Sequence, residues 1–217
     1  MIVDCISDLH GYYPELEGGD LLIVAGDLTA MDDYKGYCIF NEWMIKNSRI
    51  YSKCIVIAGN HDNGLLPGRF NVENLPHVIY LCDSGTVFEG MKIWGSPWTK
   101  TFLGMNPKCK AFTVDTENEL IDKFEAIPIN TDILITHSPP YGILDKTIRG
   151  ENVGSKYLYN WLKYCGRPKI HVFGHIHEAY GREEVFDTYN YQMMQSVNAS
   201  LVNERYEPVN KPIRIIL

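Results

Sequence analysis

Residues 53–62, KCIVIAGNHD, join an uninterrupted apolar run to a cluster of polar side chains. The run KCIVIA is short, rich in β-branched residues and followed by a glycine, which predicts a buried strand that ends at a turn. Residues 21–27, LLIVAGD, repeat this arrangement. Strands with continuous apolar character are typical of parallel sheets that are covered on both faces. These two stretches therefore favour a layered α/β fold.

Short apolar runs and helical patterns alternate along the rest of the chain. We expect further strands at residues 1–6, 132–135 and 169–173, and helices at residues 31–50, 116–127 and 153–164. The first of these helices has residues near helical spacing at Tyr37, Phe40, Trp43, Met44 and Asn47. Turn signals between residues 78 and 94 separate three short strand candidates, for which we predict antiparallel pairing. Residues 183–217 are expected to be rich in strands, and no composition shift divides residues 1–217, so we expect one domain.

Five of the predicted strands end at side chains that can bind metal ions. These side chains are Asp8 and His10 after the first strand, Asp27 after the second, Asn60, His61 and Asp62 after the third, His137 after residues 132–135, and His175 and His177 after residues 169–173. In open α/β sheets, ligands bind at the carboxyl ends of the strands. Five of the seven histidines lie at such ends, whereas His171 lies inside a strand and is interpreted as structural.

Each of these motifs is weak when it stands alone, because Asp and Asn followed by glycine or histidine are also common in ordinary turns. Together and in this order, they resemble the calcineurin-like metallophosphoesterase superfamily. Four further stretches resemble its branch of metallophosphoesterase domain-containing proteins, which includes small cyclic-nucleotide phosphodiesterases: Gly95–Trp98, Thr131–His137, Val172–Glu178 and Asn198–Ser200. The resemblance implies a four-layer α/β/β/α sandwich with two central mixed sheets and a site at the strand C-terminal ends.

The resemblance also implies a centre of two divalent metal ions. It assigns Asp8, His10 and His177 to the first ion, Asn60, His137 and His175 to the second, and Asp27 as the bridge between both. His61 would bind no ion but would stand over the scissile phosphate, oriented by Asp62. Water between two cations loses a proton near neutral pH, so a bridging hydroxide would attack the phosphorus while His61 protonates the leaving oxygen. Imidazole, carboxylate and amide ligands without a thiolate favour manganese, with iron or zinc as alternatives, over calcium.

Composition restricts the class of protein and of substrate. Of the 217 residues, 45% are hydrophobic and 22% are charged, as in ordinary soluble domains. The net charge of −7 argues against a nucleic-acid polymer as the partner. The N-terminal sequence lacks the basic region of a signal peptide, and no apolar run approaches the roughly 20 residues that span a bilayer, so we expect a cytoplasmic protein without a membrane partner. No cysteines form a C-x-x-C pair, and Cys5 and Cys54 are expected to be buried thiols.

We expect the chain to hydrolyse small phosphodiesters such as cyclic nucleotides. A protein Ser/Thr phosphatase, a nuclease and a non-catalytic scaffold of the same fold remain alternatives. The complete ligand set, with His61 present, favours an enzyme over a scaffold. The oligomeric state stays open.

Several residues near the motifs bear on substrate choice. Possible contacts with substrate are Tyr12, Tyr13, Tyr141, Tyr180, Lys146 and Arg149, although each is also explained as part of the rim or of a solvated loop. Asn152 stands where members of the branch carry a histidine, and this departure bears on the selectivity of this chain relative to theirs.

Overall fold

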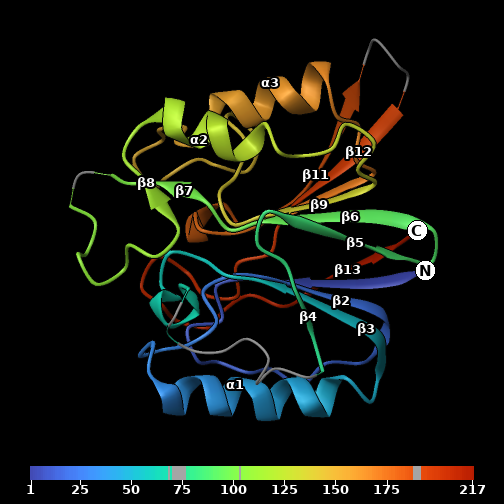
Figure 1. The fold of residues 1–217 in the computed structure, drawn as a ribbon, viewed down its shortest axis with the longest axis vertical. Coiled ribbons are helices and arrows are strands. Elements are labelled where there is room, and N and C mark those ends of the chain that lie inside the picture. Colours follow the sequence, from blue (N-terminus) through green and yellow to red (C-terminus); the bar gives the residue numbers. More distant parts are fainter. Residues whose placement is uncertain (68, 70–76, 103, 188–191) are drawn as a thin grey trace.

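Two mixed β-sheets lie face to face in the computed structural model, and helices cover both outer faces (Figure 1). The structure describes residues 1–67, 69, 77–102, 104–187 and 192–217. Within these ranges, no helix combines the length and the apolar character that crossing a bilayer requires.

The first sheet has the strand order β13–β1–β2–β3–β4. Its strands are β1 (Ile2–Ile6), β2 (Gly19–Ala25), β3 (Tyr51–Ile57), β4 (Ile79–Tyr80) and β13 (Ile213–Ile216). Strand β13 runs antiparallel to β1, and the other neighbours are parallel. The carboxyl ends of β1, β2 and β3 therefore meet at one edge of this sheet.

The second sheet has the strand order β11–β12–β10–β9–β6–β5. Its strands are β5 (Ser84–Phe88), β6 (Met91–Ser96), β9 (Ile133–Thr136), β10 (Ile170–Phe173), β11 (Gly181–Asp187) and β12 (Gln192–Asn198). The four central strands are parallel, and the two outermost strands are antiparallel to their neighbours. A separate pair of short strands, β7 (Thr99–Lys100) and β8 (Thr113–Val114), lies beside the sandwich.

Among the described residues, three α-helices form the outer layers, and the residue before each helix caps it with its side chain. Helix α1 (Tyr34–Asn47) covers the first sheet, while α2 (Glu117–Phe124) and α3 (Lys156–Tyr164) cover the second (Figure 1). Their N-caps are Asp33, Thr116 and Ser155, each of which accepts a hydrogen bond from a backbone N–H of the first turn. Short 3-10 turns follow at η1 (Asn63–Leu65) and η3 (His177–Ala179).

Apolar side chains fill the three spaces between the four layers. One cluster joins α1 to the first sheet, a second lies between the two sheets, and a third joins the second sheet to α2 and α3. The buried residues of α1 are the five that the helical spacing singled out: Tyr37, Phe40, Trp43, Met44 and Asn47. Cys5 and Cys54 are buried, as expected. The predicted α/β/β/α sandwich with mixed sheets is confirmed.

The prediction of three antiparallel strands between residues 78 and 94 is wrong for the first of them. Strands β5 and β6 do form an antiparallel hairpin, but β4 pairs in parallel with β3 in the other sheet. The pairing continues at Leu81, whose N–H donates to Val56 at 2.9 Å. The chain then crosses between the sheets at Asp83, whose carboxylate accepts hydrogen bonds from Ser96 and Trp98. A turn signal in the sequence does not say to which sheet each flanking strand belongs.

Candidate metal centre

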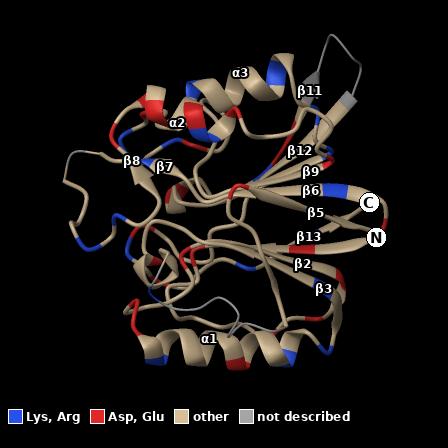
Figure 2. Cartoon of the chain, viewed as in Figure 1, with Lys and Arg blue, Asp and Glu red and all other residues tan. Residues whose placement is uncertain are grey.

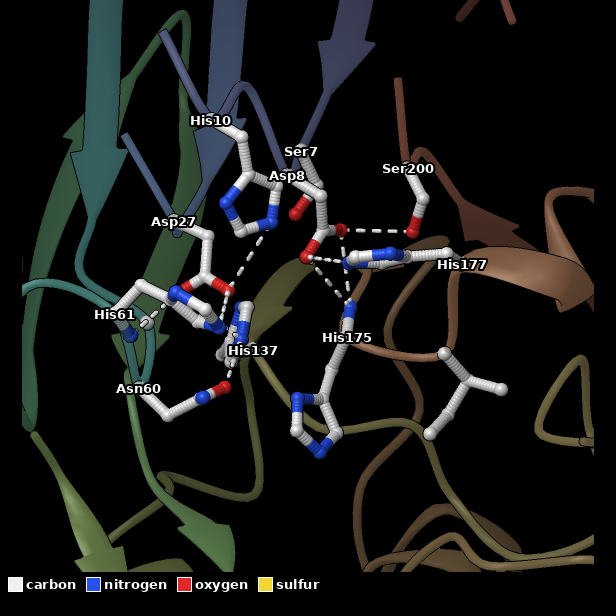
Figure 3. A network of polar contacts seen from close by, with 12 residues as sticks. Ser7, Asp8, His10, Asp27, Asn60, His61, His137, His175, His177 and Ser200 are labelled. Carbon is white, nitrogen blue, oxygen red and sulfur yellow. Dashed lines mark hydrogen bonds and ion pairs between the residues drawn. The ribbon is translucent and has the colours of Figure 1, made fainter. Parts of the chain in front are cut away.

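The nine predicted site residues gather where the carboxyl ends of the parallel strands of both sheets meet. Figure 3 labels all of them except Asp62. The loops after β1, β2 and β3 bring six of them from the first sheet: Asp8, His10, Asp27, Asn60, His61 and Asp62. The loops after β9 and β10 bring the remaining three from the second sheet: His137, His175 and His177. The structure thus places one cluster of side chains across the seam between the sheets.

The backbone of this cluster adopts conformations that side chains rarely allow. Asp8, His10, Asp27 and His175 have φ angles of 51°, 42°, 55° and 70°, in the left-handed region. Each such residue costs on the order of 1–3 kcal/mol, and such strain concentrates at functional sites. Hydrogen bonds between loops hold it in place, because the N–H groups of Asp8 and His10 donate to Gly26 and Asp27, each at 3.0 Å.

Glycines before three of the predicted ligands allow the two sheets to approach closely. A Cβ on Gly174 would lie 2.0 Å from Oδ2 of Asp8, and one on Gly59 would lie 2.2 Å from Oδ1 of Asp27. A Cβ on Gly26 would lie 2.6 Å from Nδ1 of His137. Any side chain at these positions would displace a site residue, so glycine here is required by packing.

One half of the site is formed by Asp8, His10 and His177, whose ligand atoms lie within 4.8 Å of one another. Nε2 of His177 faces Oδ1 of Asp8 at 3.3 Å, and Nδ1 of His177 lies 3.2 Å from the carbonyl of Asn203. A carbonyl can only accept, so Nδ1 carries a proton and Nε2 points at the cluster. The Asp8 carboxylate accepts hydrogen bonds from the His175 N–H at 3.0 Å and from the Ser200 hydroxyl at 2.7 Å.

The other half surrounds His137, which is fully buried. Its Nδ1 lies 2.9 Å from the carbonyl of Ala25, so Nδ1 donates there and Nε2 is directed at the site. Nε2 lies 3.0 Å from Oδ1 of Asn60 and 3.5 Å from Oδ1 of Asp27. The ring of His175 is 5.1 Å from that of His137, between centroids.

Asp27 lies between the two halves and presents a different oxygen to each. Its Oδ1 faces His137, while its Oδ2 lies 3.7 Å from Nε2 of His10 and 3.9 Å from Nε2 of His61. Figure 3 shows these three imidazoles around the Asp27 carboxylate. A carboxylate in this position can bind two cations at once, one through each oxygen.

The electrostatics of the site fit bound cations. Asp8, Asp27 and Asp62 are at least 99% buried, and within the described ranges no lysine or arginine forms an ion pair with any of them. Buried carboxylates need compensating positive charge. Nε2 of His10 is buried without a hydrogen-bond partner among the described residues. Two ligand atoms about 2.1 Å from one ion lie roughly 3–3.5 Å apart, close to the observed N–O separations.

The pKa shifts of the histidines follow from burial and from the neighbouring carboxylates. Burial lowers the pKa of His10 to about 4, and burial together with His137 lowers that of His175 to about 3, so both rings are neutral and able to bind a metal. Burial also acts to lower the pKa of His137, but the Asp27 carboxylate outweighs it and raises the value to about 9. In the absence of a cation, His137 therefore supplies part of the missing positive charge.

Asp62 differs from the sequence expectation. Its Oδ2 accepts from the N–H groups of Asp27 and Gly59 at 2.9 and 2.7 Å, and its Oδ1 accepts from that of Leu28 at 2.9 Å. Burial and then the charge of Asp27 raise its pKa to about 8, against the effect of these donors. Within the described part of the chain, no hydrogen bond or ion pair joins Asp62 to the imidazole of His61. Its carboxylate instead ties the loop that carries Asp27 to the loop that carries Asn60 and His61.

Two residues at the site were not among the predicted ones. Ser200 follows β12 at the same sheet edge and donates to Asp8, so the strand-end pattern would have found it if extended beyond His177. Tyr206 packs its ring against His10 and His177, with centroid distances of 4.8 and 5.2 Å. It comes from a loop outside any strand-end motif, and no sequence signal marks it.

A cavity of about 940 Å³ extends from the cluster toward α3 and the loop that precedes it. Tyr141, Arg149 and Asn152 line it, as do Phe102 and Tyr206. The other residues that we expected as possible substrate contacts are not part of the cavity lining. Tyr13 donates to the Leu28 carbonyl and packs against α1, Tyr180 donates to the Lys211 carbonyl, and neither Tyr12 nor Lys146 is part of the cavity lining.

His171 is fully buried, and its Nε2 lies 2.8 Å from the hydroxyl oxygen of Thr136. Burial lowers its pKa to about 3. The interpretation of His171 as structural agrees with this position inside β10.

Comparisons with known proteins place the site in a family context. Residues 1–179 match the model of the calcineurin-like phosphoesterase family. Metallophosphoesterase domain-containing protein 1 of Homo sapiens is 36% identical, over 98% of this chain and 70% of its own length. A UPF0046 protein of Caenorhabditis elegans is 32% identical, over 96% of this chain and 58% of its own length. The solved structure of phosphopantetheinyl hydrolase from Mycobacterium tuberculosis has the same fold, with a TM-score of 0.58 and 16% identity over 99% of this chain and 95% of that one.

Proposed function

This chain belongs to the calcineurin-like phosphoesterase family, and we propose that it hydrolyses small phosphodiesters with two divalent cations, manganese first among them. The observation that carries this proposal is the position of Asp27, whose two oxygens face opposite halves of one buried cluster. In this assignment Asp8, His10 and His177 hold one ion, and Asn60, His137 and His175 hold the other. When bound, the ions act as Lewis acids and lower the pKa of water between them.

The residues around the cluster keep its ligands in fixed orientations. The carbonyls of Ala25 and Asn203 fix the tautomers of His137 and His177, so that Nε2 of each ring is left to bind. The Asn60 amide donates to the Cys109 carbonyl at 3.2 Å, which leaves its Oδ1 facing His137. Ligands arranged in this way need little reorganisation when cations bind.

His61 is the group best placed to handle the leaving oxygen. Its backbone N–H donates to Oδ1 of Asp27 at 2.9 Å, which fixes its loop, and its side chain is 22% exposed on the cavity lining. A ring nitrogen of His61 lies within 4.8 Å of ligand atoms of His10 and Asp27. Because Asn60 already supplies a ligand from this loop, we assign the imidazole of His61 to proton transfer to the leaving oxygen instead.

The cavity supports a small organic phosphodiester as substrate. Its volume of about 940 Å³ is far more than a phosphate occupies, and aromatic side chains of Phe102, Tyr141 and Tyr206 line it beside Arg149. Such a surface suits the organic group of an ester, for instance the base of a cyclic nucleotide. A diester carries one negative charge and a monoester nearly two, so charge alone does not choose between them.

The distribution of charge does not favour a long nucleic acid. The net charge is −7, and Figure 2 shows lysines and arginines scattered over helices and loops among acidic residues. Polymer binding rests on many basic contacts to phosphates along one face.

A hydrolysis screen with manganese tests the proposal. It would compare kcat/KM for an aryl phosphodiester, the matching aryl monoester, 2′,3′- and 3′,5′-cyclic nucleotides, a phosphopeptide and single-stranded DNA, with the chelated protein as control. We expect the diester and a cyclic nucleotide to be the best substrates and chelation to remove activity. Preference for the monoester or the phosphopeptide would support a phosphatase instead. Equal activity with and without chelator would exclude the metal-dependent reaction.

A further inference from the structure

Tyr206 contacts three imidazoles of the site at once. Its ring lies edge-on to those of His10 and His177, with centroid distances of 4.8 and 5.2 Å. The ring of His61 is 6.1 Å away and tilted. Tyr206 is half-exposed and lines the cavity, so it covers the cluster from the solvent side.

The loop that carries Tyr206 is tied to itself by Asn203. The Asn203 side-chain oxygen accepts from the N–H groups of Arg205 and Glu207 at 2.9 and 3.0 Å, and the Tyr206 N–H donates to the Asn203 carbonyl at 2.9 Å. Tyr206 has a φ angle of 61°, a left-handed conformation that is strained for an aromatic residue. A strained residue in a tightly hydrogen-bonded turn indicates that the position of its ring is under functional constraint.

The same turn also orients a predicted metal ligand. The Asn203 carbonyl accepts from Nδ1 of His177 at 3.2 Å, and His177 is one of the rings that Tyr206 touches. A single short loop thus fixes both the tautomer of His177 and the aromatic side chain above it.

His61 is held by ring contacts rather than by a strong hydrogen bond. Asp62, the residue expected to orient it, accepts three hydrogen bonds from backbone N–H groups and none from the His61 imidazole within the described residues. The polar contact of the His61 imidazole within the described residues is a long one, 3.9 Å from Nε2 to Oδ2 of Asp27. Its ring packs edge-on against His10 at 4.7 Å, and His10 packs in turn against Tyr206.

We propose that Tyr206 is a positioning residue: its ring, packed on His10 and His61, holds the His61 imidazole in the orientation that proton transfer requires. This inference rests on the proposed function, because it assigns His61 the leaving-group proton. The ring carries the role, since all the contacts are between ring faces and edges. The phenol hydroxyl makes no hydrogen bond within the described part of the structure.

The kinetic test compares Tyr206→Ala with Tyr206→Phe. We expect Tyr206→Ala to lower kcat by about 10–100-fold with little change in KM and with two metal ions still bound, because a small misplacement of a catalytic group has a large effect on rate. Tyr206→Phe should stay within about threefold of the parent. The matched control is Tyr164→Ala, which removes an exposed tyrosine at the end of α3. A rise in KM at constant kcat would overturn the proposal, since Tyr206 would then be a substrate contact.

A double-mutant cycle asks whether Tyr206 acts through His61. In a His61→Ala background, Tyr206→Ala should cause little further loss, because no imidazole remains to be positioned. Additive losses would contradict this coupling, and so would loss of bound metal in Tyr206→Ala alone.

Nuclear magnetic resonance of the histidine rings separates this inference from the proposed function. In zinc-loaded and metal-free protein, the His61 imidazole signals should shift in Tyr206→Ala and remain near their parent positions in Tyr206→Phe. This result requires no substrate, so it holds even if the hydrolysis screen fails. Unchanged His61 signals in Tyr206→Ala would refute the positioning role.

Discussion

The two ends of the first sheet treat buried charge in opposite ways. Near its amino-terminal edge, the nearly buried Asp4 accepts two hydrogen bonds from Arg214, each of 2.8 Å, and a third from the hydroxyl of Tyr51. Arg214 also donates to Glu17 at 2.7 Å and to the Gly18 carbonyl at 2.8 Å. Arg214 is thus paired with both Asp4 and Glu17.

At the carboxyl-terminal edge, no lysine or arginine of the described residues pairs with the buried carboxylates. Asp27 faces three imidazole nitrogens at 3.5–3.9 Å, and Nε2 of His10 has no hydrogen bond within the described ranges. The comparison shows that this sequence can neutralise a buried aspartate where stability alone is required. The incomplete pairing at the other edge therefore indicates a site completed by something bound.

The largest expected effect comes from removing one carboxylate at each edge. Asp27→Asn should abolish turnover and reduce bound metal, because Asp27 contacts both halves of the cluster. Asp4→Asn should leave kcat unchanged and lower the free energy of unfolding by about 2 kcal/mol, since it weakens a paired, partly buried charge. Metal per chain by mass spectrometry, urea unfolding and kinetics check both. Full metal occupancy in Asp27→Asn would falsify its bridging role.

The next effect separates His61 from the metal ligands. His61→Ala should reduce kcat by roughly 10²–10⁴-fold while both metal ions stay bound, because its loss removes one acid–base group. His137→Ala is the contrasting variant, since it removes a ligand and should lower metal content as well. If His61→Ala releases a metal ion, His61 is a ligand and the assignment of its loop must change.

A third effect tests whether the glycines are needed for close approach. Gly174→Ala would place a Cβ 2.0 Å from Oδ2 of Asp8, so we expect metal affinity to fall about 10–100-fold, as for other disturbances behind a ligand. Gly90→Ala is a control away from the site, because no atom lies within 4 Å of the added Cβ and any loss there comes from the positive φ of Gly90 alone. Titration with manganese measures both. Equal affinities in the two variants would show that the site tolerates the displacement of Asp8.

The smallest expected effect concerns His171, buried between the two edges. In the folded chain the pKa of His171 is about 3, below its ordinary value of 6.5. Between these two pH values, the unfolded chain therefore binds more protons than the folded chain. Stability that His171 contributes is therefore present above about pH 6.5 and is lost as the pH falls toward 3. When the pH is lowered from about 7.5 to 5, the free energy of unfolding of the metal-free parent should fall. In metal-free His171→Gln, this fall should be smaller by about 1–2 kcal/mol, as measured by urea unfolding. Identical losses in both proteins would rule out a neutral buried His171.

Much of the fold can be predicted from the sequence, because buried parallel strands and amphipathic helices have strong local patterns of apolar residues. LLIVA and KCIVIA both form central strands, and the predicted face of α1 is buried residue by residue. The helices begin later than predicted, at Tyr34, Glu117 and Lys156, because capping side chains set their starts. The partner of β4 and the existence of β7 and β8 depend on long-range pairing of two-residue strands, which leave no periodic pattern.

The site residues were predictable where they follow strands, and their partners were not. Asp8, Asp27 and His137 come together because parallel strands deliver their carboxyl ends to one edge. Asp62 was expected beside its neighbour His61, but its carboxylate turns toward the backbone of residues 27, 28 and 59. Tyr206 reaches the site through a loop whose shape depends on Asn203. No local sequence motif predicts that its ring contacts the histidines of the site.

The seam between the sheets has a consequence for the order in which the molecule assembles. Asp27 and His137 belong to different sheets, and the Ser200 hydroxyl that holds Asp8 arrives from a third, distant part of the chain. Neither sheet alone can gather both halves of the cluster, so a folding intermediate with one sheet formed would hold a cation weakly. Tight binding of metal would then begin only when the sheets dock. A bound ion, held by residues of both sheets, would slow the separation of the two sheets.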